Sequence, residues 1–332
     1  MVEIQSIVQE LTQSPAAGGV LATLVSVEGS SYRRPGARLL LTSDGRRIGS
    51  ISGGCLEEDL LARARRVAET GRAELVTYDT TAENDVVWGV GLGCHGVVKV
   101  LLERLSAAPP WPPVLAANFL AHQPTQLHVV WQAPDPHLIG TALPPDRLSL
   151  PESVVVFHDT ILPPNRLVIF GAGDDVRPLI RLAKELGWHV TVGDPRSAFA
   201  TAARFPAADA LIVAPAAELV ARINPPPDAL AVVMTHHYVH DVPILRDLFS
   251  RNLPYVGLLG PKKRARQIIT DLHASGVSPT ELQLARFHAP VGLDLGAETP
   301  EEVALSIVAE MRAKLAARDG RPLRERTRPI HG

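Results

Sequence analysis

Apolar residues in the first hundred positions follow patterns typical of strands and of one helix. The run GVLATLVSVEG alternates apolar and small residues, and ARLLLTSDGRRIGSIS holds two short apolar runs around a turn at 43–45, which predicts a strand and then a hairpin. Apolar residues then recur at helical spacing from Leu56 to Ala68, and Gly71 stands where a left-handed residue ends a helix. With further strands predicted at AELVTYD and GVVKVLLERL, residues 1–107 are expected to form an α+β domain.

The pattern changes in the second half of the chain. Residues 108–164 are proline-rich and hold only short strand-like pieces such as QLHVVWQ and SVVVFHD, so we interpret them as an extension of the first domain plus a linker. Beyond them, five short apolar runs (RLVIF, HVTVGD, ALIVA, LAVVMT and PYVGLLG) alternate with helix-like segments. Such alternation is typical of a parallel sheet covered by helices. The fold class predicted is α/β, with a Rossmann-like doubly wound domain at 165–320 and a tail at 321–332.

Helix-end signals add one more element. Thr299 and Glu302 have the spacing of a capping box, and Pro300 stands between them at the first helical position. They predict that a helix begins at Pro300.

Composition narrows the classes of function. The 332 residues are 46% hydrophobic and 20% charged, which is typical of a globular protein of two domains. A net charge of −2 leaves no excess of cations for nucleic-acid phosphates. No apolar run approaches the roughly 20 residues that span a bilayer, and the amino-terminal stretch carries acids where a signal peptide carries Lys or Arg. We therefore expect a cytoplasmic protein that binds neither nucleic acid nor membrane.

A dinucleotide-like turn opens the second domain. In RLVIFGAGDDVRPLIRLAKELGWHVTVGDPR, Gly171 and Gly173 lie between a strand and a helix, and Asp194 follows the next strand, which is the Rossmann layout. Val176 replaces the third glycine, and two acids follow Gly173 where phosphates would lie. The sequence predicts Rossmann topology and keeps an NAD(P)-dependent oxidoreductase as an alternative function.

The first domain offers groups that suit an anion. Ser52, Gly53 and Gly54 precede a predicted helix, so their amides could face an anion, and Cys55 falls near the first turn, where the helix dipole favours a reactive thiolate. A small buried side chain under the turn is the alternative for Cys55. Both cysteines of the chain are expected to be reduced, and Cys94, in the glycine-rich stretch GVGLGCHGV, could face the same pocket.

Two further groups of polar residues could contact a ligand. Arg33, Arg34 and Arg38 surround a Pro-Gly turn, and guanidinium groups match phosphate oxygens in pairs, although pairing with surface acids is the alternative. His236 and Asp241 of MTHHYVHD follow an apolar strand, where they could contact a ligand or cap the next helix. Zinc is disfavoured because the spacing of Cys55, Cys94 and His95 matches no standard zinc pattern.

Several blocks, taken in order, resemble the XdhC/CoxI family, the accessory proteins of molybdenum hydroxylases. They are VEGSSYRRPGARLLL, GSISGGCLEEDL and GLGCHGVVKVLLE in the first half, then FGAGDDVRPL, MTHHYVHD, YVGLLGPKKR and HAPVGLDLGAETPEEVALSIVAE. Two positions depart from the family pattern: Tyr32 stands where proline is expected, and His95 where glycine or asparagine is common.

The resemblance implies a chaperone role without turnover. Such a protein would bind molybdenum cofactor, protect it while a cysteine desulfurase replaces an oxo ligand by sulfide, and deliver it to an apo-hydroxylase. Cys55 would then be a possible molybdenum ligand, and a homodimer is expected.

Overall fold

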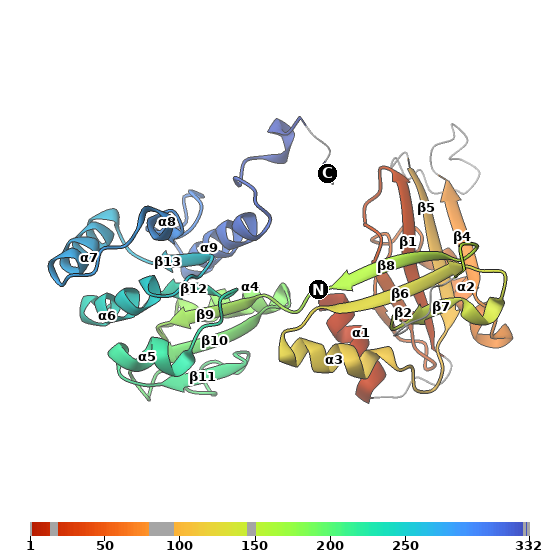
Figure 1. The fold of residues 1–332 in the computed structure, drawn as a ribbon, viewed down its shortest axis with the longest axis horizontal. Coiled ribbons are helices and arrows are strands. Elements are labelled where there is room, and N and C mark those ends of the chain that lie inside the picture. Colours follow the sequence, from red (N-terminus) through yellow and green to blue (C-terminus); the bar gives the residue numbers. More distant parts are fainter. Residues whose placement is uncertain (1, 14–18, 80–95, 145–150, 328–329, 331–332) are drawn as a thin grey trace. The chain divides into compact units, whose positions relative to one another are not determined.

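The structure is a computed structural model that describes residues 2–13, 19–79, 96–144, 151–327 and 330. The chain divides into two compact units, Met1–Pro163 and Pro164–Gly332, which are described separately (Figure 1). None of the helices in these described ranges is long and apolar enough to cross a membrane.

A five-stranded antiparallel sheet forms the centre of the first unit. Its strands lie in the order β3-β2-β1-β5-β4, and their bounds are β1 (Val20–Gly29), β2 (Arg38–Leu41), β3 (Arg47–Gly49), β4 (Glu74–Asp79) and β5 (Gly96–Arg104). Helix α2 (Glu57–Thr70) covers one face, where Leu60, Ala64 and Val67 pack against β1 and β5. The predicted end at Gly71 is confirmed, because its φ of 69° is left-handed and its N–H donates to the carbonyl of Val67.

A second, smaller sheet covers the other face of the first. Its strands lie in the order β7-β6-β8, and their bounds are β6 (Thr125–Gln132), β7 (Gly140–Ala142) and β8 (Val155–Ile161), with a short 3-10 helix η2 (Pro136–Leu138) between β6 and β7. Two helices, α1 (Val2–Gln13) and α3 (Trp111–Ala121), pack on the same face (Figure 1). Leu127 and Ile161 of this sheet pack with Leu21 and Leu40 of the larger one. The proline-rich stretch therefore contains a layer of the first unit.

The second unit is a six-stranded parallel sheet covered by helices on both faces. Its order is β11-β10-β9-β12-β13-β14, and its elements are β9 (Arg166–Phe170), α4 (Val176–Glu185), β10 (His189–Asp194), β11 (Ala210–Val213), α5 (Ala216–Ile223), β12 (Leu230–Val233), α6 (Tyr238–Phe249), β13 (Tyr255–Leu258), α7 (Lys262–Ala274), α8 (Glu281–Leu284), β14 (Phe287–His288), α9 (Pro300–Leu315) and η3 (Leu323–Glu325). The predicted Rossmann topology is thus confirmed.

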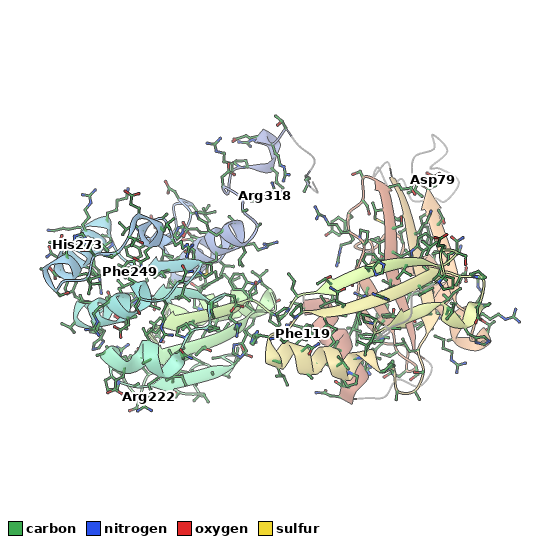
Figure 2. All side chains as sticks on the ribbon, in the orientation of Figure 1. Asp79, Phe119, Arg222, Phe249, His273 and Arg318 are labelled. Carbon is green, nitrogen blue, oxygen red and sulfur yellow. The ribbon has the colours of Figure 1, made fainter. Side chains whose placement is uncertain are left out.

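Two apolar clusters hold this sheet between its helices. One cluster joins α4 and α9 to one face, and the other joins α5, α6 and α7 to the opposite face. Phe249, labelled in Figure 2 at the carboxyl end of α6, packs its ring 5.3 Å from that of Phe287. The helix predicted to begin at Pro300 does so, with the Thr299 hydroxyl accepting from the Glu302 amide and the Glu302 side chain accepting from the Thr299 amide.

Candidate functional site

The glycine-rich loop between β3 and α2 wraps around an internal carboxylate. Oε1 of Glu57 accepts hydrogen bonds from the Ser50 hydroxyl at 2.9 Å and from the amides of Ile51 and Ser52 at 3.1 and 2.8 Å. Oε2 accepts from the Gly54 amide at 2.8 Å and from the Ser52 hydroxyl. Burial of the Glu57 carboxyl would raise its pKa, but the hydrogen bonds from Ser52, Ser50 and Gly54 outweigh burial and lower it to about 2.

This arrangement corrects the expectation that the loop amides are open to an external anion. The amides of Ser52 and Gly54 donate to Glu57, and that of Gly53 donates to the Ser50 hydroxyl at 3.1 Å. The loop does bind an anion, but the anion is part of the chain. Sequence reasoning missed Glu57, although an acid in the first turn after a glycine-rich loop is a signal that could have pointed to it.

Cys55 is exposed and lies two residues before the first residue of α2, near the first helical turn but outside it. Its exposure excludes the alternative of a buried space-filling side chain. It lines a cavity of about 40 Å³ between the β3–α2 loop and the segment after β1, together with nine other residues: Leu24, Ser30, Ser31, Tyr32, Ile51, Ser52, Leu56, Gly96 and Val98. Two segments separated in sequence thus meet beside the sulfur.

Gly53 brings these two segments into contact. Its φ of +81° is left-handed, and a Cβ added there would lie 3.0 Å from Cε1 of Tyr32. A side chain at this position would therefore push against the Tyr32 ring as well as strain the backbone.

The three candidate arginines lie in different surroundings. Arg33 donates from both terminal nitrogens to the Glu3 carboxylate of α1, and these hydrogen bonds raise the pKa of Arg33 despite its partial burial. Arg38 is buried, with Nη1 2.7 Å from Oδ2 of Asp159 on β8. Arg34 is exposed, and among the described residues it has no ion pair or side-chain hydrogen bond.

These placements separate the arginines by role. Arg38 joins the two sheets of the first unit, so the expectation that it contacts a ligand is corrected by its partner, Asp159. Arg33 holds α1 and is already paired. Arg34 alone of the three is left to attract an external anion.

Cys94 and His95 lie outside the described residues. Within the described ranges, no group of three or more His, Cys, Asp or Glu side chains could hold a metal ion.

The Rossmann turn of the second unit also contains internal carboxylates. Asp194 is fully buried and accepts from the Ala172 amide at 2.7 Å and from the Arg196 amide and guanidinium at 2.8 to 2.9 Å. Burial opposes its ionisation, but the hydrogen bonds from Arg196 and Ala172 outweigh burial and lower its pKa. These partners satisfy the carboxylate that would hold a ribose hydroxyl in a dinucleotide site.

Both glycines of the turn serve close packing. Gly171 has φ +127°, and a Cβ there would lie 2.3 Å from the carbonyl oxygen of Met234, the residue that follows β12. A Cβ on Gly173 would lie 2.4 Å from Oδ1 of Asp175, whose other oxygen is 2.8 Å from Nε2 of His236. The space over Gly173 thus contains a carboxylate where a pyrophosphate would approach.

His236 and Asp241 have separate partners. His236 is exposed, with a left-handed φ of 60°. Asp241 is buried and is held by the Thr235 hydroxyl at 2.5 Å and by the guanidinium of Arg264. Asp241 therefore stabilises the first turn of α6, whereas His236 lies at the surface.

Comparison with known proteins identifies the family. The model of the XdhC and CoxI family matches residues 15–79, and that of the XdhC Rossmann domain matches 167–311. A Bacillus subtilis protein, described as a probable xanthine dehydrogenase subunit, is 37% identical over 88% of this chain and 92% of its own length. This chain belongs to the XdhC and CoxI family.

Two other proteins are similar to this chain along most of its length. The Escherichia coli molybdenum cofactor insertion chaperone PaoD is 26% identical over 89% of this chain and 82% of its own. A crystal structure from Bacillus halodurans, described as a xanthine dehydrogenase, is 31% identical, covers 98% of both chains and has a TM-score of 0.81. The XdhC and CoxI fold thus includes both units.

Proposed function

We propose that this XdhC and CoxI protein is an accessory factor that binds molybdenum cofactor and passes it to an apo molybdenum hydroxylase of the xanthine dehydrogenase type. Two relatives, one named as a cofactor insertion chaperone and the other as part of a probable xanthine dehydrogenase, support this role. The structural observation that carries it is the exposed Cys55 thiol at a small cavity, on a loop that Glu57 holds in shape.

The cargo is an anionic pterin with a phosphate, a dithiolene and a metal. A thiolate is a soft ligand for such a metal, and a guanidinium suits the phosphate. Cys55 supplies the first and Arg34 the second. A cavity of about 40 Å³ has room for a few water molecules, so only the end of the cargo would enter it. The rest of the cargo would lie across the open surface, as suits a protein that must release it.

The remaining parts of the role rest on the family resemblance. We propose that a cysteine desulfurase exchanges a metal oxo ligand for sulfide while the cargo is bound, and that delivery involves a homodimer. An NAD(P)-dependent oxidoreductase has less support, because Asp194 and Asp175 are already paired within the turn that would hold the dinucleotide.

The test is to purify the full chain anaerobically from cells that make molybdenum cofactor. Molybdenum would be measured by mass spectrometry and pterin by fluorescence after oxidation. We expect both in the wild type, with severalfold less in Cys55→Ser and Arg34→Ala. Arg72→Ala is the matched control, since it removes an exposed arginine just after α2. A wild-type protein that carries neither pterin nor molybdenum would refute the proposal.

A further inference from the structure

Tyr32 is 68% exposed, and it lines the same cavity as Cys55. We propose that Tyr32 is the aromatic surface on which the flat ring of the pterin stacks, and that it selects a ring-bearing cargo. The inference rests on the proposed cofactor-binding function and adds the residue that would recognise the organic part of the cargo.

The inner side of the ring is fixed by backbone. Gly53 lies so close to Tyr32 that an added Cβ would be 3.0 Å from Cε1 and 3.5 Å from Cδ1 and Cζ. The loop that carries Gly53 is anchored in turn by Glu57, which accepts from the amides on either side of that glycine. The tyrosine therefore rests on a rigid support, and most of its surface faces solvent.

An exposed aromatic side chain is ordinary on a protein surface when it stands alone. Tyr32 differs because it lines the same cavity as the Cys55 sulfur. A ligand whose metal approaches that sulfur would bring its attached ring near the cavity wall to which Tyr32 contributes. Stacking on a tyrosine face suits a planar heterocycle.

Charge along the two segments gives the cargo a direction. The loop amides are taken by Glu57, and the exposed Glu58 adds negative charge at the start of α2, so a phosphate is repelled from that side. Arg34 follows two residues after Tyr32 and has no partner among the side chains that the structure describes. Arg34 is therefore the cation that we assign to the phosphate of a cargo with its metal at Cys55 and its ring on Tyr32.

The test measures equilibrium binding to the full-length protein. The probe is molybdenum cofactor released from a purified molybdoenzyme under anaerobic conditions, and bound and free pterin are separated by ultrafiltration. Removing a stacking side chain weakens binding by about 5- to 150-fold in comparable ring contacts. We expect that loss for Tyr32→Leu, which keeps bulk without an aromatic face, and affinity within about twofold of wild type for Tyr32→Phe.

A control variant comes from the second unit, where Phe199 is also an exposed aromatic ring. Phe199→Leu should bind like the wild type. Thermal midpoints should be similar for the wild type and the Tyr32 variants, since Tyr32 is 68% exposed. The midpoint of Phe199→Leu should be lower, since the Phe199 ring lies 3.9 Å from the guanidinium carbon of Arg196 and would lose that contact.

The outcomes separate this inference from the function on which it rests. If the wild type does not bind the probe, the proposed function fails. If the wild type binds and Tyr32→Leu binds equally well, stacking on Tyr32 is refuted while cofactor binding stands. If Tyr32→Phe is as weak as Tyr32→Leu, the hydroxyl rather than the ring makes the contact, which also refutes the proposal.

Discussion

At the scale of single residues, Glu57 decides what the glycine-rich loop can do. A loop of small residues before a helix ordinarily offers its amides to a phosphate. Here one carboxylate accepts three amides and two hydroxyls from that loop. The loop is therefore a rigid support for Cys55 and Tyr32, and the external anion has to find its cation elsewhere.

Glu57→Gln should destabilise the protein by about 1–3 kcal/mol at pH 7, because an amide nitrogen would face backbone N–H donors that need an acceptor. The pKa of Glu57 is depressed in the folded state, from an ordinary 4.5 to about 2. Its contribution is therefore complete above pH 4.5 and is lost as the pH falls toward 2. Urea unfolding of both proteins between pH 7 and pH 3 should show the difference in free energy shrink with acidity.

Glu58→Gln provides the control for this pH series, because Glu58 is the exposed neighbour on the same helix. It should follow the wild type throughout. A Glu57→Gln protein as stable as the wild type at pH 7 would contradict the role given to this carboxylate.

At the scale of elements, the two sheets of the first unit are joined by a buried ion pair. Arg38 on β2 is 3% exposed and lies 2.7 Å from Asp159 on β8. Its Nε and Nη2 have no hydrogen-bond partner in the described part of the chain. At this point the two sheets are therefore held together by an ion pair and not by apolar side chains.

Loss of both partners should lower the free energy of unfolding by less than the two single losses added together. Arg38→Met or Asp159→Leu alone should lower the free energy of unfolding by about 3–5 kcal/mol, since each leaves a buried charge without its counterion. The double variant should lose less than the sum of the two. A double-mutant cycle by chemical denaturation measures the coupling, and strictly additive effects would show that the pair does not act as a unit.

At the scale of the whole molecule, each unit has apolar clusters of its own. The first unit is built around two sheets and the second around one. Each is above the size at which a domain can bury a sufficient core.

Residues 1–163 and 164–332, made separately, should therefore each fold. We expect one cooperative urea transition for each fragment, with m-values that together approach that of the full chain, because m scales with the surface exposed on unfolding. Circular dichroism typical of an unfolded chain for either fragment would show that it depends on the other.

The sequence by itself determined the alternation of strands and helices in the second half and the helix ends at Gly71 and Thr299. These features depend on local periodicity and capping, which neighbouring residues set. The resemblance of several blocks, taken in order, identified the family. The layer formed by β6, β7 and β8 was harder to predict, because its strands are short and separated by prolines and pair only through contacts distant in sequence.

Only the tertiary structure decided which candidate groups are open to a ligand. Arg33, Arg34 and Arg38 have the same chemistry in the sequence, but Glu3 and Asp159 reach two of them from distant elements. Likewise, the loop amides and Asp194 are satisfied by partners that a motif does not show. A hydrogen bond or ion pair depends on two groups meeting in space, whereas a sequence pattern describes one group at a time.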